Sequence, residues 1–427
     1  MKKEQKTITN ANEGRQNKLN VPTLRFKEYS DTWQETPFDS TFDILTNNTL
    51  SRAELNYEDG TYKNIHYGDV LIKFPAHIDV EDQEVPFVNE YSSSVKFDDA
   101  LLQDGDIVIA DTAEDYTVGK ATEIENSSMR KVVSGLHTIP CRPKMKFAAR
   151  YLGYYINSPA YHNQLIPYIQ GVKVSSVSKT LIKNTSISYP SYGEQSKIAE
   201  FLSALDSKIE TQNKIIEDLK ILKKELMDYV LNTCDFMELS IKNLIDCGFA
   251  RIIKASEMKK FDGTRKYLST SSIGENGIEQ VESIITYTDR PSRAAMLPIK
   301  GSIWFAKMKN SVKVYQSTDD DENRYILSTG FYGLLCDETK VNSRWLIELF
   351  KSDYFNTQKD KFSEGSSMSG IKDSQLADIK LKVFADKKEE TYHTDNIQNL
   401  SNKIQLEKNT HEMLLKQKQS FLNVMFI

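Results

Sequence analysis

The stretch Glu194–Met237 reads EQSKIAEFLSALDSKIETQNKIIEDLKILKKELMDYVLNTCDFM and decides the fold of this chain. From Ile198 onward, mostly apolar residues recur in alternating steps of four and three, which is the a/d pattern of a heptad seam. No proline or glycine follows Gly193 in this run, so the sequence predicts one long helix that requires a partner helix. At about 1.5 Å per residue, the helix forms a rod of roughly 60 Å. The seam positions are Ile198, Leu202, Leu205, Ile209, Gln212, Ile216, Leu219, Lys223, Leu226 and Val230.

The second half of the chain contains the matching helix. Adding 195 to each seam position gives a second seam with the same polar interruptions. Gln212 maps to Glu407, and Lys223 maps to Lys418. Polar seam residues cost stability and commonly fix register. In an antiparallel pair, we hypothesise that Gln212 faces Lys418. Lys223 then faces Glu407, and swapping both of these charges should be tolerated better than swapping one. The second seam consists of His393, Ile397, Leu400, Ile404, Glu407, His411, Leu414, Lys418, Phe421 and Met425.

The sequence outside the long helices is also duplicated. The glycine-led run 105–110 corresponds to 301–306, and the helical run 149–158 corresponds to 343–352. We therefore predict an α+β (mixed) fold: two globular α/β domains in tandem repeat, separated by two long helices that form an antiparallel coiled coil with pseudo-twofold symmetry. The expected parts are a disordered tail at 1–20, a first globular domain at 21–190, a central long helix at 191–233, a second globular domain at 234–387 and a C-terminal long helix at 388–427.

Shorter patterns predict the elements inside the first globular domain. The apolar runs Asp69–Phe74 and Asp106–Ala110 are typical of strands. A helical pattern covers Ala148–Ile169, and another strand is expected near Thr185–Tyr189.

Composition limits the possible classes of protein. The net charge is −5, so the whole chain is not a basic nucleic-acid binder by composition, although local basic patches remain possible. The four cysteines lie far apart and form no CxxC pair, which argues against structural zinc and favours a reducing cytoplasm. There is neither a signal peptide nor a run of about 20 apolar residues, so we expect a cytoplasmic protein without a membrane span.

Catalytic signatures are absent from the sequence. GxxxxGK[ST], HExxH, GxSxG and the NPP-aromatic motif of amino methyltransferases do not occur. The six histidines form no close pair, and His393 and His411 fall on the second seam, where a packing role is expected rather than metal ligation. We therefore expect no catalytic residue and no metal ligand.

Clusters of basic and hydroxyl residues are more informative. Cations supply charge for phosphate binding, and small donors in loops position the backbone of a nucleic acid. Each patch alone is typical of a solvated surface loop, but glycine-serine loops recur at equivalent places in both halves. The candidate DNA-binding residues are Lys120, Lys131, Gly171, Lys173, Ser175, Ser176, Lys179, Arg290, Arg293, Lys307, Lys309, Lys313, Gly365, Ser366, Ser367, Ser369 and Lys372.

Two segments resemble a known family. The segment VPTLRFKEYSDTW at 21–33 resembles the opening of specificity (S) subunits of type I restriction–modification systems, and PSYGEQSKIAEFLSALDSKIE at 190–210 is similar to the start of that family's central helix. The second long helix departs from the pattern, because EETYH at 389–393 replaces the Glu-Gln start.

The resemblance implies a function without catalysis. Each globular domain would be a target recognition domain that reads one half of an asymmetric, bipartite sequence in double-stranded DNA. The helix pair would set the gap between the half-sites and dock the methyltransferase subunits. The implied partners are two modification subunits, which use S-adenosylmethionine, and two restriction subunits, which use ATP and Mg. The chain itself would bind no cofactor.

Two other classes of protein remain open at this point. One is a structural coiled-coil adaptor whose globular domains bind proteins. The other is a nuclease or methyltransferase with a degenerate motif. Basic and aromatic residues in the loops of both domains favour the DNA-recognition subunit.

Overall fold

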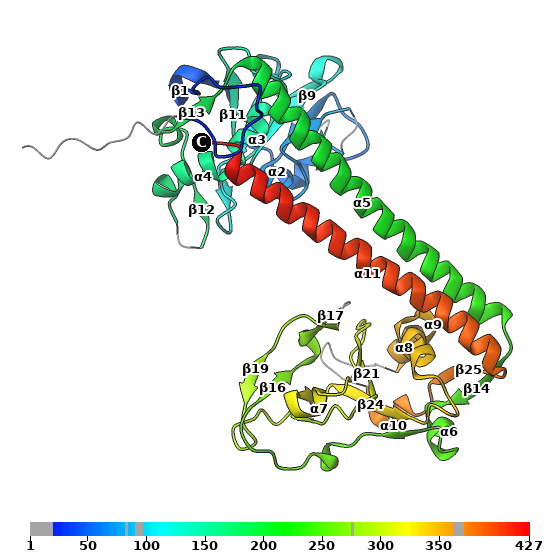
Figure 1. The fold of residues 1–427 in the computed structure, drawn as a ribbon. Helices are drawn as coiled ribbons and strands as arrows, with labels where there is room; N and C mark the ends of the chain where they lie inside the picture. Colours follow the sequence, from blue (N-terminus) through cyan, green and yellow to red (C-terminus); the bar gives the residue numbers. More distant parts are fainter. Residues whose placement is uncertain (1–19, 82–83, 90–96, 172, 275–276, 363–370) are drawn as a thin grey trace, which may run out of the picture. The chain divides into compact units, whose positions relative to one another are not determined.

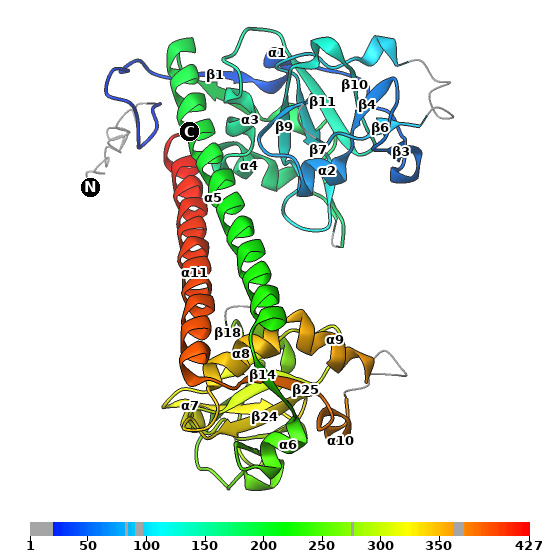
Figure 2. The same cartoon turned by 90° about the vertical axis from the view of Figure 1, so that its right-hand side faces the viewer.

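The structure is a computed structural model that describes residues 20–81, 84–89, 97–171, 173–274, 277–362 and 371–427. The chain forms two compact units: unit 1 comprises Met1–Thr211 with His411–Ile427, and unit 2 comprises Gln212–Thr410. Two long helices, α5 (Tyr192–Thr233) and α11 (Lys387–Val424), contribute to both units and lie side by side in Figures 1 and 2. The mixed α/β fold with two paired long helices is thus confirmed. None of the helices in the described ranges is long and apolar enough to span a membrane.

Unit 1 is built on two sheets and two short strand pairs. The strand orders are β2-β11-β7-β9-β5, β10-β4-β6-β3, β1-β13 and β12-β8. The strands are β1 (Gln34–Pro37), β2 (Phe42–Ile44), β3 (Leu55–Asn56), β4 (Tyr62–Ile65), β5 (His77–Asp79), β6 (Phe87–Val88), β7 (Ile107–Ala110), β8 (Thr112–Ala113), β9 (Ala121–Glu125), β10 (Lys131–Ser134), β11 (Thr138–Pro143), β12 (Ser175–Ser176) and β13 (Ser186–Tyr189). The helices are α1 (Phe38–Thr41), α2 (Tyr67–Ile72), α3 (Tyr151–Ile156) and α4 (Pro159–Leu165).

Unit 2 repeats this plan. Its strand orders are β15-β24-β21-β22, β19-β16-β23-β20, β14-β25 and β17-β18. The strands are β14 (Phe236–Ser240), β15 (Ala250–Ile252), β16 (Arg265–Leu268), β17 (Ile273–Gly274), β18 (Gly277–Ile278), β19 (Ser283–Ile285), β20 (Ala294–Met296), β21 (Ile303–Ala306), β22 (Val314–Gln316), β23 (Tyr325–Ser328), β24 (Phe331–Cys336) and β25 (Lys380–Phe384). The helices are α6 (Ile241–Asp246), α7 (Asp321–Arg324), α8 (Ser343–Lys351), α9 (Asp353–Lys361) and α10 (Asp373–Leu376).

The duplication seen in the sequence holds at the level of strand pairing. In unit 1, β4 pairs in parallel with β10, and in unit 2, β16 pairs in parallel with β23. The sheet order β2-β11-β7-β9 of unit 1 corresponds to β15-β24-β21-β22 of unit 2. The pairs β1-β13 and β14-β25 are both antiparallel and flank the long helices in the chain. The two units therefore share one scaffold.

Two of the expected elements differ in the structure. The run Asp69–Phe74 is not a strand, because Tyr67–Ile72 forms α2, whose first turn is capped when His66 Nδ1 accepts from the Gly68 N–H. A short apolar run does not distinguish a strand from a buried helix. The helical pattern at 148–169 is broken between α3 and α4, because Pro159 begins a new helix and cannot continue the previous one.

The core of unit 1 joins its first residues to the helix pair. Trp33 packs edge-on against Tyr151 and Phe426, and all three side chains are buried. Arg25 makes a bidentate ion pair with Glu194, at 2.7 Å for each bond, and this carboxylate is buried at the start of α5. The segment that resembles the opening of the S-subunit family thus anchors the first long helix.

The register of the helix pair differs from our hypothesis. Gln212 does not face Lys418, because its Nε2 donates to Glu407 of the other helix. Lys418 instead forms an ion pair with Asp206 at 2.6 Å. Lys223 does not face Glu407 but pairs with Glu348 of α8 at 2.6 Å. A heptad pattern defines the apolar side of each helix, but sliding one helix by whole heptads keeps apolar residues in contact, so the pattern did not determine the register.

Burial along the two helices follows the seam positions. Ile198, Leu202, Leu205, Gln212, Ile216, Val230, Ile397, Ile404, Leu414 and Met425 are buried. The remaining seam residues are half-buried: Ile209, Leu219, Lys223, Leu226, His393, Leu400, Glu407, His411, Lys418 and Phe421.

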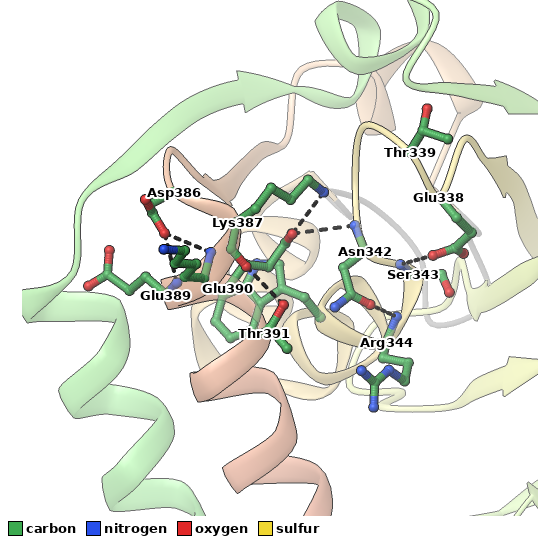
Figure 3. A network of polar contacts seen from close by, with 12 residues as sticks. Glu338, Thr339, Asn342, Ser343, Arg344, Asp386, Lys387, Glu389, Glu390 and Thr391 are labelled. Carbon is green, nitrogen blue, oxygen red and sulfur yellow. Dashed lines mark hydrogen bonds and ion pairs between the residues drawn. The ribbon is translucent and has the colours of Figure 1, made fainter.

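The starts of α5 and α11 use equivalent contacts despite their different sequences. In unit 1, Gln195 Oε1 accepts from the Ala148 N–H at 3.0 Å, ahead of α3. In unit 2, Glu390 Oε1 accepts from the Asn342 N–H at 3.3 Å, ahead of α8, as Figure 3 shows. Both side chains are buried, and Glu390 also pairs with Lys387 at 2.9 Å. The EETYH departure therefore retains this contact, with glutamate in place of glutamine.

This equivalence leads to a first prediction. We expect Glu390→Gln to change the free energy of unfolding by less than about 1 kcal/mol, because the amide oxygen can still accept from Asn342 as Gln195 does from Ala148. Glu390→Leu should lower it by roughly 1–3 kcal/mol, because it leaves the Asn342 N–H without its acceptor. Urea unfolding of the two variants measures the difference. Equal losses in both variants would show that the accepted bond is not what stabilises this corner.

Candidate nucleic-acid interface

In each unit, polar loops gather where the two parallel strands end. Gly135 follows β10, and Gly330 lies just beyond β23. A Cβ on Gly135 would lie 2.5 Å from Nδ2 of Asn64, and one on Gly330 would lie 2.9 Å from Cγ2 of Thr270. Only glycine permits such close approach of the neighbouring chain. The scaffold therefore brings several loops together at the carboxyl ends of these strands.

In unit 1, the loop after β2 is fixed across the strand ends. The Asn48 N–H donates to the Ser134 carbonyl at 2.8 Å, and Asn48 Nδ2 donates to Asn64 Oδ1 at 2.7 Å. Asn47 Nδ2 donates to the Gly135 carbonyl at 3.2 Å. These amides are used within the protein, so they hold the loop in place.

The candidate loop 171–179 is attached to the same region. The Val177 N–H donates to the carbonyl of Asp111, which directly follows β7, at 2.9 Å. Ser175 and Ser176 form β12, which pairs with β8. Lys179 Nζ donates to Asn47 Oδ1 at 2.6 Å. An ammonium has three N–H donors, so this bond leaves Lys179 able to contact a phosphate or a base edge as well.

A pocket lies beside these loops. Its volume is about 360 Å³, and its lining combines polar side chains with a few apolar ones. Thr46 and Thr49 are exposed there, and hydroxyl groups of this kind can donate to or accept from either a phosphate or a base. The lining residues are Thr46, Asn47, Asn48, Thr49, Leu50, Phe97, Asp99, Ala100, Val133 and Ser134.

The corresponding region of unit 2 is centred on Lys307, which directly follows β21. The Lys307 N–H donates to the Gly330 carbonyl at 2.9 Å, and its carbonyl accepts from the Ile371 N–H at 3.0 Å. Lys307 Nζ pairs with Asp373 at 3.0 Å. Arg293 joins the group through its backbone, because its carbonyl accepts from the Thr329 N–H at 2.8 Å. The fold thus brings Arg293 and Lys307 to the same turn, at Thr329 and Gly330. This proximity was not predictable from the sequence.

The loop between β21 and β22 carries Lys309 and is held by α9. Asp360 accepts from the Asn310 N–H at 3.2 Å, and Lys359 Nζ donates to the Ser311 carbonyl. Lys359 is buried, and this burial lowers its pKa to about 8. Thr270 Oγ1 also contacts Met308 Sδ at 3.4 Å. Lys309 itself is exposed, so the loop presents a cation to solvent from a supported backbone.

Other candidate residues take different places. Lys131 lies at the opposite end of β10 from Ser134 and pairs with Asp98 at 2.7 Å. Lys120 donates to the Leu71 carbonyl at 2.9 Å, and burial, with a smaller contribution from Lys418, lowers its pKa.

The guanidinium of Arg290 is occupied within unit 2. It stacks over Tyr287, at 4.1 Å from the ring centroid, and donates to the Tyr287 and Ala294 carbonyls. Gly171 has a φ of +110°, Lys173 and Lys372 are exposed, and Lys313 is half-buried. Gly365, Ser366, Ser367 and Ser369 lie outside the described residues.

The sequence reasoning missed two polar runs that the structure places at these loops. One is the segment Thr46–Thr49 of unit 1, and the other is Ser269–Ser272 of unit 2, which follows β16. Both runs lie just after a strand, β2 or β16, and that position is the signal that would have identified them. They contain no cation, so a search for basic clusters passed over them.

The two units differ in charge on the same scaffold. Asp111 and Lys307 occupy equivalent positions, since each follows the matching strand and accepts from the matching loop residue, Val177 or Ile371. The backbone contacts are therefore conserved between the units while the side-chain charge is reversed. The two units therefore present different side-chain chemistry at matching positions.

Fold and site together define a tandem-repeat protein, in which two copies of one α/β scaffold carry different polar loops and are joined by paired long helices. The sequence model of the "Type I restriction modification DNA specificity domain" matches residues 30–220. This match covers just under half of the chain and makes residues 30–220 similar to a type I DNA specificity domain.

Individual relatives agree with this family. The MjaVIII type I restriction enzyme specificity subunit of Methanocaldococcus jannaschii is 24% identical over 278 residues, which cover 60% of this chain and 64% of that protein. The chain thus spans just under two thirds of that relative. The S subunit of a type I system from M. genitalium has a similar fold, with a TM-score of 0.57 at 13% identity over 95% of this chain and 99% of that one. A structure from a study of type I complex assembly gives a TM-score of 0.56 at 13% identity, covering 91% of this chain and 96% of that one.

Proposed function

We propose that this chain is the DNA sequence-specificity subunit of a type I restriction–modification complex and that each unit reads one half of an asymmetric, bipartite target. The observation that carries the proposal is the reversal of charge between Asp111 and Lys307 on otherwise equivalent backbone. A shared scaffold suits two similar docking events on a duplex, and different side chains suit different half-sites.

The target recognition domains correspond to residues 21–190 and 234–387 in this proposal. In the first, Lys179 and the hydroxyls of Thr46 and Thr49 contact DNA. In the second, Arg293, Lys307 and Lys309 supply the cations, and Thr270 adds a hydroxyl. Phosphate contacts from the cations position each unit, and the hydroxyls and cations that reach base edges read the sequence.

The helix pair has two roles in the proposed complex. Its length sets the gap between the half-sites, and its exposed faces dock two modification subunits. Those subunits supply S-adenosylmethionine and methylate adenine, and two restriction subunits supply ATP- and Mg-dependent translocation and cleavage. The specificity subunit recognises the target sequence, and its partner subunits catalyse the reactions.

A gel-shift experiment separates this function from that of a protein-binding adaptor. The chain is assembled with its modification subunits and mixed with a pool of random duplex DNA at moderate salt. We expect a retarded complex whose bound DNA becomes enriched in an interrupted sequence over successive rounds. Assembly without retention of DNA, or retention without enrichment, would favour the adaptor.

A further inference from the structure

Three side chains with metal-ligand chemistry meet at the start of α11 in unit 2. Cys234 directly follows the last residue of α5, while Glu389 and His393 lie four residues apart and so on one face of α11. One ligand atom from each of the three lies within 4.8 Å of the other two, and all three side chains are half-buried. Cys234 precedes Glu389 by 155 positions in the chain, so no spacing motif identifies the three residues as a group.

The distances suit a small tetrahedral ion. Cys234 Sγ lies 3.4 Å from His393 Nε2. A tetrahedral Zn²⁺, with bonds of about 2.3 Å to sulfur and 2.0 Å to nitrogen, separates these two ligand atoms by roughly 3.5 Å. The side chains therefore need little movement to bind an ion between them.

The packing of His393 fixes the direction of the ring nitrogen that would bind an ion. Its ring stacks on Phe384, with an interplanar angle of 6°, and this contact fixes the direction of the ring. Nδ1 is buried and has no hydrogen-bond partner among the described residues. The other ring nitrogen, Nε2, faces Cys234 Sγ and is therefore the atom placed to bind an ion.

We propose that Cys234, Glu389 and His393 form a binding site for Zn²⁺, with water as the fourth ligand. A thiolate, an imidazole and a carboxylate are the ligands that zinc prefers, whereas magnesium and calcium prefer oxygen alone. Without metal, burial and then the neighbouring Glu389 raise the pKa of Cys234. Zinc binding therefore replaces the thiol proton, which is released to solvent. The ion would tie the end of α5 to the start of α11 in unit 2.

Cobalt titration of the full-length chain tests this site, because Co²⁺ bound to a thiolate gives a charge-transfer band in the near ultraviolet. After dialysis against a chelator, we expect the band to saturate at one equivalent of Co²⁺ and to disappear when Zn²⁺ is added. Cys247→Ser is the matched control, because Cys247 is exposed and belongs to no such cluster in the described ranges. It should retain the band, and Cys234→Ser should lose it.

A second variant separates ligation from folding. Glu389→Gln keeps the size and polarity of the side chain, and it should weaken cobalt binding roughly tenfold or more while the circular dichroism spectrum stays unchanged. The proposal is overturned if the wild-type chain gives no band, or if Cys234→Ser gives the same band as the wild type. In either case the three residues form a hydrogen-bonded cluster only.

Discussion

Removal of residues 213–219 from α5 together with residues 400–406 from α11 should shorten the preferred gap between the half-sites by about three base pairs. One heptad contributes roughly 10 Å of helix, and base pairs are about 3.4 Å apart along the duplex. The two blocks face each other, because Gln212 contacts Glu407 across the pair. Deleting both therefore preserves the contacts on either side. A heptad also turns a helix by a nearly whole number of turns, so the seam stays aligned.

Selection of bound sequences from DNA pools with graded spacers measures this effect, using the chain assembled with its modification subunits. The matched control removes residues 213–219 alone. This single deletion places the rest of α5 seven residues out of step with α11, and we expect it to lose DNA binding. If the double deletion selects the parent spacer, the helix pair does not set the gap.

Replacing Arg293, Lys307 and Lys309 of unit 2 with alanine should weaken DNA binding by roughly 100-fold, at about 1 kcal/mol for each lost charged contact. Each lost phosphate contact also releases fewer counterions, so the slope of log affinity against log salt should become shallower by roughly 2 to 3. The matched control replaces Lys242, Lys380 and Lys388, which are exposed in unit 2 and lie outside the candidate interface. It makes the same change in net charge.

Titrations at several salt concentrations distinguish the two variants. A fall in affinity of the same size in the control variant would mean that only the net charge of unit 2 matters. An unchanged salt slope in the Arg293 variant would show that these residues do not contact phosphates.

Much of the architecture was predictable because the sequence contains two kinds of repeat: the heptad pattern within each long helix, and the duplication that relates the two halves of the chain. The alternation of four and three residues identified both long helices, and the fixed offset between them identified two copies of one module. The register between the helices was not predictable, because the seam pattern repeats with each heptad. The observed contact of Gln212 with Glu407 joins two positions that are equivalent in the duplication.

The candidate site was predictable only in part. Basic residues such as Arg293 and Lys307 stand out in the sequence, but their meeting depends on the parallel pairing of β16 and β23, which no local pattern encodes. The Thr46–Thr49 loop has no charge to mark it. Cys234 and His393 meet only because the end of α5 and the start of α11 lie together in unit 2. Local sequence patterns predict individual helices and strands. Contacts between residues far apart in the sequence become visible only in the three-dimensional structure.

The central claim is that two copies of one scaffold, which differ in the polar and charged side chains of their loops, recognise two different DNA sequences separated by a gap. Mapping methylated adenines across the genome of a cell that carries this chain with its modification subunits tests the claim most directly. We predict one interrupted motif with two unlike halves and a spacer of constant length. A contiguous motif, or an interrupted motif with identical halves, would contradict it.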